Sequence, residues 1–375
     1  MNGEVVYLYA YDVAYEADLA EIQKKLQGAA ERFRLGHLKD APRNFPFYRS
    51  LIVQTEDMRL DGPRGPLTLS TTIRLFAVGA ISVGVRVPVA WQRISDLVSY
   101  HDLRFQDNTT LDERVREIVE RLFQTVKPQL DTPVAALKQP EVYTIFCLNA
   151  PLTEATEATD VSSGESMDEW LRRNRREVAA LFDGETDATQ LSDQEVQDTL
   201  KYKYSYYYDD LAVLDWDTAL LVDTPEGCLE ILYILEVANL QLEELKVYDA
   251  MLDAVLDQAY DDVEAVARLH AFRQRRRVLA NLRELRMDLT KVADELSNIT
   301  KFIGDWHLAR IYMGCAARFH LPEWEDIVSQ KLRTLDSLYM MLQQDGMNRA
   351  MLMLEMAIVG LFVIDLVIIV VLGIK

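Results

Sequence analysis

The nineteen residues from Met356 to Ile374 constrain this chain most, because they are almost entirely apolar and only Lys375 follows them. At the rise of an α-helix they extend about 28 Å, close to the hydrocarbon thickness of a bilayer, which is about 30 Å. Their fourteen Leu, Ile, Val and Phe residues favour insertion by about 4 to 8 kcal/mol, against a cost of about 3 kcal/mol for Asp365. The segment predicts one C-terminal transmembrane helix; the alternative is a buried core helix.

The two ends of the chain together predict a tail-anchored topology. The N-terminus, Met-Asn-Gly-Glu-Val-Val-Tyr, has no basic or apolar leader region and no Arg-rich transit segment. We therefore expect a cytoplasmic body and a single-pass anchor at 349–375, inserted after synthesis. Arg349 before the span agrees with the positive-inside rule, whereas Lys375 beyond it weakens the count.

Charge restricts the partners of the body. The 375 residues carry a formal net charge of −20, and such a surface repels nucleic acids and anionic lipids. Cations and basic protein surfaces remain as ligands, and no nucleic-acid partner is expected. The three cysteines, Cys147, Cys228 and Cys315, are not paired in spacing, which favours a reducing compartment over a disulfide framework.

The N-terminal part, 1–150, reads as an α+β domain. Apolar and β-branched runs predict strands at Val5–Tyr11, Leu51–Gln54 and Val142–Leu148, and a hairpin of Leu67–Val78 and Ala80–Val89 around Gly79. Helical spacing of apolar residues predicts helices at Glu16–Leu26 and Leu111–Val126.

A Thr-, Glu- and Ser-rich stretch, 151–168, follows and is typical of a solvated linker or an insertion. The α+β pattern continues over 169–225, with a helix at Met167–Phe182 and a strand pair or bent strand at Leu211–Val222. The Tyr-rich run Lys201–Tyr208 favours a strand with Tyr on both faces; the alternative is a platform on which bases stack.

Residues 226–348 form the predicted helical region. Neither proline nor glycine occurs between Cys228 and Phe302, and apolar residues alternate at spacings of four and three, as in a coiled coil. They are Val278, Leu282, Leu285, Leu289, Val292, Leu296, Ile299 and Ile303, with Ile231, Leu235, Ala238, Leu242 and Leu245 upstream. The polar residues 257–262 are the expected point of reversal between two helices. Further helices are expected at Trp306–Phe319 and Glu323–Gln344.

Four carboxylates on the predicted long helix lie at successive i, i+4 positions and form an acidic ribbon. They are Asp249, Asp253, Asp257 and Asp261. Like charges at this spacing repel unless they are neutralised. A divalent cation would neutralise them; the other hypothesis is pairing with the arginines at 273 and 275–277.

No catalytic or cofactor site is predicted. Asp215 and Asp217 would point the same way on a strand, but no nucleophile or base accompanies them. Histidines 37, 101, 270, 307 and 320 lack metal-ligand spacing, and no phosphate-binding, nucleophile-elbow or zinc motif occurs.

Several C-terminal residues carry a family resemblance. They are Gly304-Asp-Trp-His-Leu-Ala-Arg310, Pro322-Glu-Trp324, Leu338-Tyr339, Asn348-Arg349 and Leu354-Glu355. In these the chain resembles the domain-of-unknown-function family that includes the "required for meiotic nuclear division" proteins. That resemblance implies an α+β domain, a helical region, one C-terminal membrane helix, and a role as an assembly or support factor without established enzymatic activity.

A second resemblance is to CorA-type magnesium channels, through Gly346-Met347-Asn348. In those channels the Gly-Met-Asn signature follows the first of two membrane spans, whereas here it precedes the apolar segment. The resemblance implies, as the alternative function, a divalent-cation channel or transporter component.

The sequence therefore predicts a non-enzymatic, tail-anchored scaffold or assembly factor without a cofactor. Protein partners or further copies would bind through helices 229–303 and 356–374. Within the span, Asp365 would contact another helix, and Gly360 would ease the close approach. The competing classes are the cation channel and a hydrolase that uses Asp215 and Asp217.

Overall fold

The computed structural model describes residues 2–26, 28–32, 49–53, 57–62, 65–149, 166–268 and 306–372. The chain forms two compact units. The first contains Met1–Val247 and Glu295–Glu323, and the second contains Tyr248–Asp294 and Trp324–Lys375. The division therefore passes through two long helices and does not coincide with the start of the helical region expected at residue 226.

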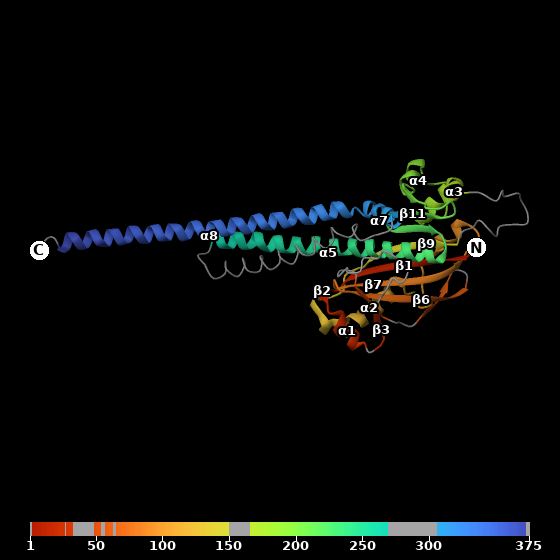
Figure 1. Ribbon diagram of the computed structural model, residues 1–375, viewed down its shortest axis with the longest axis horizontal. Helices are drawn as coiled ribbons and strands as arrows, with labels where there is room; N and C mark the ends of the chain where they lie inside the picture. Colours follow the sequence, from red (N-terminus) through yellow and green to blue (C-terminus); the bar gives the residue numbers. More distant parts are fainter. Residues whose placement is uncertain are drawn as a thin grey trace, which may run out of the picture. The chain divides into compact units, whose positions relative to one another are not determined.

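Strands dominate the first unit (Figure 1). They are β1 (Asn2–Asp12), β2 (Ala14–Ala17), β3 (Ala30–Arg32), β4 (Ser50–Val53), β5 (Met58–Gly62), β6 (Gly65–Phe76), β7 (Ala80–Ala90), β8 (Leu130–Pro133), β9 (Glu141–Leu148), β10 (Tyr202–Tyr204), β11 (Leu211–Leu214) and β12 (Thr218–Val222). Within the described residues, one sheet has the order β10-β11-β12-β9-β1-β7-β6-β4-β3, with β5 also paired to β6, and β2 pairs with β8. Every pair is antiparallel except β12 with β9, which is parallel.

The helices follow the predicted order. They are α1 (Leu19–Lys25), α2 (Leu111–Val126), α3 (Met167–Phe182), α4 (Asp193–Thr199), α5 (Pro225–Arg268), α7 (Trp306–Arg318) and α8 (Leu321–Leu372), with 3₁₀ turns η1 (Ile94–Asp96), η2 (Val98–Tyr100) and η3 (Lys127–Gln129). Thr110 begins α2 and Ser166 begins α3 with capping boxes, in which the hydroxyl accepts from a backbone N–H of the first turn and a Glu returns the bond. These caps explain why both helices begin where the apolar periodicity begins.

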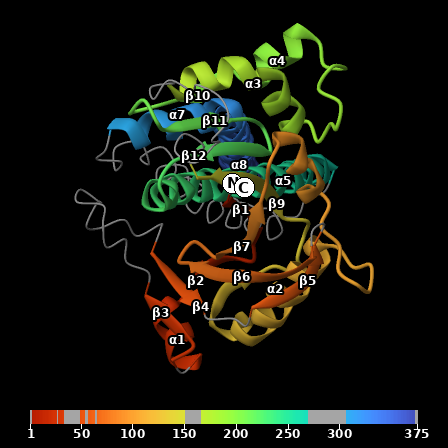
Figure 2. The ribbon, with the colours of Figure 1, turned by 90° about the vertical axis from the view of Figure 1, so that its right-hand side faces the viewer.

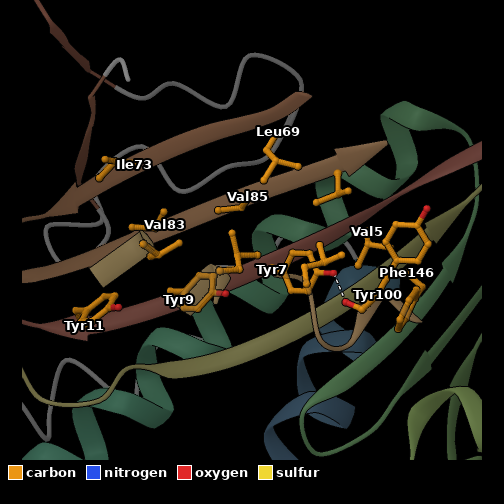
Figure 3. Close-up of a cluster of buried hydrophobic side chains, with 14 of the residues drawn as sticks. Val5, Tyr7, Tyr9, Tyr11, Leu69, Ile73, Val83, Val85, Tyr100 and Phe146 are labelled. Carbon is orange, nitrogen blue, oxygen red and sulfur yellow. Dashed lines mark hydrogen bonds between the residues drawn. The ribbon is translucent and has the colours of Figure 1, made fainter. Parts of the chain in front are cut away.

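One face of the sheet packs against α2 and α3. Alternate residues of β1 point into this core, and the hydroxyl groups of two of its tyrosines are hydrogen-bonded there (Figure 3). Tyr7 donates to the carbonyl of Tyr100, and Tyr9 donates to Asp112 of α2 at 2.8 Å. Satisfied hydroxyls allow large aromatic side chains to be fully buried.

The opposite face is covered by α5 and α7 (Figure 2). Tyr143 of β9 packs edge-on against Phe319, with ring centroids 5.1 Å apart. Gly314 of α7 lies against Tyr204 of β10, and a Cβ at this glycine would overlap the tyrosine ring. The upstream apolar residues of the predicted heptad, such as Leu235 and Ala238, are fully buried here. They pack within a globular core and so do not demonstrate a coiled coil.

Most elements expected from periodicity are confirmed. The hairpin of β6 and β7 turns at Gly79, whose φ of +76° and contact with the carbonyl of Ala14 both require glycine. The strand pair around Asp215-Trp216-Asp217 is β11 and β12. The fold consists of a sheet-rich N-terminal region, a helical C-terminal region and one candidate apolar helix.

The reversal expected at residues 257–262 is wrong, because α5 continues as one helix to Arg268. No proline or glycine interrupts this polar stretch, so nothing in it opposes a solvated helix. The regular heptad from Val278 to Ile303 lies outside the described residues, and the coiled coil stays a prediction.

Two further differences concern the region around β10. The tyrosine run is a strand only over Tyr202–Tyr204, and Tyr206, Tyr207 and Tyr208 lie in a loop. The expected linker 151–168 lies, in sequence, between β9 and β12, which are neighbours in one sheet. Residues 150–165 of this stretch lie outside the described part of the chain, so its character as a linker or an insertion stays a prediction.

Candidate functional site

The apolar segment of α8 is the feature that most clearly sets this chain apart from a soluble domain. Met351–Ile369 has a mean hydropathy of 2.6, and none of it is buried. Leu361 and Phe362 are 67% and 70% exposed. A core helix would be covered, so this finding disfavours the core-helix alternative. Among the described residues, this is one helix long and apolar enough to cross a membrane.

Two carboxylates lie within this apolar segment, Asp365 as expected and Glu355, which the sequence analysis treated only as part of a family motif. At about 100° per residue they are about 80° apart around the helix and about 15 Å apart along it. Ile358 and Phe362 lie between them at alternating spacings of three and four. The same spacing rule, applied beyond the predicted heptad, would have identified Glu355.

Gly360 lies on another side of the helix from the two carboxylates, and its expected role in a close approach of helices stays a prediction. It is five residues from each carboxylate, so it lies about 140° from both around the helix. A side chain added at Gly360 would meet open space. Helix geometry therefore gives Asp365 and Gly360 different faces, and the polar face of this segment is that of Glu355 and Asp365.

The acidic ribbon on α5 is partly neutralised by a lysine. Lys331 of α8 places its Nζ 2.6 Å from a carboxylate oxygen of Asp249 and 2.6 Å from one of Asp253. Burial alone would lower the pKa of Lys331, but its hydrogen bonds to the two carboxylates outweigh this and raise it. A protein ammonium group thus occupies the position that a cation would take between these two residues.

The other half of the ribbon gives no metal site. Asp257 and Asp261 are solvent-exposed. The described residues contain no group of three or more His, Cys, Asp or Glu side chains arranged to hold a metal ion. The arginines at 273 and 275–277, which were the expected partners, lie outside the described residues.

Asp215 and Asp217 do not lie on a strand, contrary to the expectation that they would point the same way from one. Both lie in the turn between β11 and β12, where Asp217 accepts from the hydroxyl of Thr218 at 3.0 Å. Asp215 is nearly buried and pairs with Arg318 of α7. Burial raises the pKa of Asp215, and the guanidinium of Arg318 opposes that shift. The arrangement fastens the turn to α7, which is a structural task.

His320, whose backbone has a φ of +55°, lies beside Glu323 with Pro322 between them in sequence. Its Nδ1 is 3.5 Å from Oε1 of Glu323, and both side chains are more than half exposed. The His320 ring also stands near Trp216, with centroids 6.0 Å apart. A surface pair of this kind carries little energy.

A polar contact that the sequence analysis missed joins α5 to the sheet. Glu236 of α5 pairs with Arg74 of β6 and accepts a 2.6 Å hydrogen bond from the hydroxyl of Ser82 of β7. A small cavity of about 60 Å³ lies beside them, near Arg86 and Tyr233. Arg86 is itself paired with Glu4 at 2.8 Å. Arg74 and Arg86 are both paired with carboxylates. We therefore interpret the polar groups around the cavity as structural.

Tyr233 borders the same cavity. Burial raises its pKa to about 12; the charge of Glu236 adds to the shift and that of Arg74 opposes it. The phenol is protonated at neutral pH, as a tyrosine of ordinary pKa would also be.

A second cluster of buried polar residues lies between α5 and the sheet, and it contains titratable carboxyl groups. Glu141 of β9 pairs with Lys246 at 2.5 Å and accepts from Asn239 through its carbonyl at 3.2 Å. Burial raises the pKa of Glu243 to about 7, helped by the nearby charges of Glu141 and Asp12. Burial likewise raises the pKa of Asp12 to about 7, against the charge of Lys138. Carboxyl groups whose pKa changes on folding make the free energy of unfolding depend on pH.

Comparison with known proteins identifies the sheet-bearing region. Residues 2–228 match the family model described as "Uncharacterized protein MJ0711, N-terminal domain". This chain belongs to that family. The match ends four residues into α5 and includes every strand of the described sheet.

The chain is also similar to the uncharacterized protein MJ0711 of Methanocaldococcus jannaschii. The two are 23% identical over 262 residues, which is 68% of this chain and 76% of the relative. No solved structure matches the chain. The family is thus one of unknown function, and the link to the "required for meiotic nuclear division" proteins stays a prediction.

Proposed function

We propose that this protein is a single-pass membrane scaffold or assembly factor. In this proposal the C-terminal half of α8 crosses the bilayer, and the sheet-bearing body lies on the cytoplasmic side. The membrane segment associates with a second copy, and the acidic body binds protein partners. No catalytic step is part of the proposal.

The exposed apolar segment Met351–Ile369 is the observation on which the proposal rests. Its nineteen residues extend about 28 Å as a helix, which matches the hydrocarbon core. Water would contact every one of its large apolar side chains unless lipid or protein covered them. Soluble monomers rarely expose an apolar surface of this extent.

The two carboxylates support association within the membrane. Asp365 costs about 3 kcal/mol at the bilayer centre, and Glu355 adds a smaller cost nearer the end. A plain anchor would avoid both. A second copy running parallel would place like carboxyl groups opposite each other, where two such groups share a proton in a hydrogen bond. The face of Glu355, Ile358, Phe362 and Asp365 is therefore the proposed contact.

The state of the body's carboxylates supports the absence of catalysis. Asp215, the residue considered for acid–base work, is engaged by Arg318, and Glu236 is engaged by Arg74 and Ser82. The net charge of −20 favours basic protein partners over nucleic acids.

The CorA-type alternative gains no support from the comparisons. Gly346-Met347-Asn348 lies inside the continuous helix α8, before the apolar segment. The acidic ribbon, which would have served cations in that alternative, is bridged in part by Lys331. We therefore do not propose ion conduction.

Membrane insertion is tested by extraction from native membranes. The full chain should resist alkaline carbonate, whereas a chain lacking residues 350–375 should appear in the soluble fraction. Added protease should digest the body only from the cytoplasmic face. Release of the full chain by carbonate, or protection of the body on that face, would contradict the proposal.

Association within the membrane is tested by crosslinking of the full chain in native membranes. The double variant Glu355→Leu/Asp365→Leu should lose the dimer band by about tenfold while remaining inserted. Gly360→Leu is the matched control, because it adds the same side chain on the opposite face and should leave the band unchanged. Loss of the band in Gly360→Leu alone would assign the contact to the glycine face.

A further inference from the structure

The loop between β10 and β11 exposes an unusual concentration of aromatic side chains. Tyr206, Tyr207 and Tyr208 are 61%, 66% and 86% exposed, and Trp306 at the start of α7 is 72% exposed. The ring of Tyr206 stands 4.7 Å from that of Tyr207 and 5.4 Å from that of His307, the residue after Trp306. Two separate parts of the chain thus contribute to one aromatic surface.

The loop is held in place by hydrogen bonds. The nearly buried carboxylate of Asp210 accepts from the backbone N–H of Tyr206 at 2.7 Å and of Tyr207 at 2.9 Å. The Ser205 hydroxyl donates to the carbonyl of Tyr207 at 2.6 Å, and the Met167 N–H donates to that of Tyr208 at 2.9 Å. The backbone is therefore organised to present tyrosines to solvent, which reduces the entropy that a partner must overcome.

Negative charge accompanies these rings. Asp209 follows the tyrosines directly, and Asp223 is close to both Asp209 and Asp210. Burial raises the pKa of Asp223, and the charges of Asp210 and Asp209 raise it further. Lys203 of the adjoining strand β10 is neutralised by Asp168 at 2.8 Å. Lys201, just before β10, lies over the ring of Tyr202, and Arg310 of α7 lies over the ring of Tyr204.

We propose that the loop 205–210 is a docking site for an arginine- or lysine-rich segment of a partner protein. Guanidinium and ammonium groups bind over tyrosine faces by cation–π attraction. Asp209 and Asp223 add carboxylates that suit the same cations. The acidic flank opposes anionic lipid and nucleic acid, the other ligands that aromatic surfaces take.

The test measures binding of a labelled peptide of alternating Arg and Gly to the full chain in detergent micelles at physiological salt. Tyr207→Ser/Tyr208→Ser should weaken binding by tenfold or more, and Asp209→Asn by about threefold. Tyr207→Phe/Tyr208→Phe should retain most of the affinity because the rings remain. Tyr260→Ser is the control, since Tyr260 of α5 is also half exposed but stands outside the loop; its affinity should be unchanged.

Three outcomes would overturn the proposal. One is equal affinity of the wild type and the Ser double variant, with thermal unfolding confirming that both are folded. Another is equal weakening by Tyr260→Ser, which would show that any exposed tyrosine contributes and that the loop is not the binding site. The third is a blue-shifted emission from a polarity-sensitive dye attached at Tyr208→Cys in peptide-free liposomes, which would place the loop in lipid. None of these readouts depends on dimerisation of the span.

Discussion

The sheet-bearing unit and the C-terminal half of α8 use the same apolar residue types in opposite surroundings. Val83 and Val85 of β7 are fully buried between strands and helices, whereas Val363 is 57% exposed. In the first region, burial of apolar area by the protein itself stabilises the fold, at about 25 cal/mol per Å². In the second, none of the part of the chain that the structure describes covers the side chains. The difference teaches that periodicity identifies apolar faces, but only the fold shows which of them need an outside partner.

The largest effect is expected from a charge placed in each region. Val85→Asp buries an unpaired carboxylate in the sheet and should lower the stability of the body by more than about 4 kcal/mol. Val363→Asp should leave the melting temperature of the body unchanged and instead weaken membrane retention, by about 3 kcal/mol. Thermal unfolding by circular dichroism and carbonate extraction measure the two. If both variants and the wild type have the same melting temperature, Val85 is not in a buried core and the two regions do not differ as described.

A steric test addresses the second covered face of the sheet. Gly314→Val should destabilise the body by about 3 kcal/mol, because the added atoms overlap the Tyr204 ring. The companion Gly360→Val, where an added Cβ meets open space, should leave the melting temperature unchanged. Denaturant unfolding followed by tyrosine and tryptophan fluorescence would measure both. A stable Gly314→Val protein would show that α7 does not pack on β10 as described.

A pH test addresses the polar groups buried on α5. Asp12 and Glu243 have folded pKa values of about 7, above the usual unfolded values of about 4. The native state therefore binds more protons between these values, so stability is greatest below about pH 4 as regards these groups and falls as pH rises to about 7. Glu243→Gln should reduce that fall by about 3 kcal/mol. Identical pH profiles for the variant and the wild type would contradict the assigned shift.

The smallest effect is expected at the lysine between the acidic residues of α5. Lys331→Met should destabilise the second unit by about 1 kcal/mol, because Asp249 and Asp253 would then repel each other at i, i+4. Adding Asp253→Asn should restore most of the loss. Amide hydrogen exchange of α5 near these residues would report the change. Added Mg²⁺ should not stabilise the wild type. If it does, the hypothesis that a divalent cation neutralises the acidic ribbon would be supported instead.

Sequence patterns predicted the elements whose signals are local. The alternation in β6 and β7, the glycine between them, the apolar periodicity of α2 and the apolar run of α8 each lie within a few residues of the structure that they specify. The contacts that define the sites are remote in sequence: Arg74 meets Glu236 and Asp215 meets Arg318. No periodicity connects such residues, so their pairing had to come from the fold.

The wrong predictions each have a physical origin. The polar residues 257–262 predict a reversal between two helices, but a charged stretch without glycine or proline also continues a solvated helix well. Likewise, tyrosines favour strands, but Asp210 binds the backbone of Tyr206 and Tyr207 and so holds the chain in a loop. In the first place solvent accommodates the helix, and in the second a local hydrogen-bonded turn outweighs the strand preference of tyrosine.

The parallel pairing of β12 with β9 has a consequence for how the chain is made. When β9 leaves the ribosome, β1 can pair with one of its edges, but the other edge must wait until residues 149–217 have been added. At about 5–20 residues per second, that delay is about 3–14 s. Throughout it, the peptide groups on that edge of an apolar strand are unpaired, and nascent chains can then pair wrongly with one another. Translation speed over this interval, rather than stability of the finished protein, should therefore set the yield of correctly folded chains.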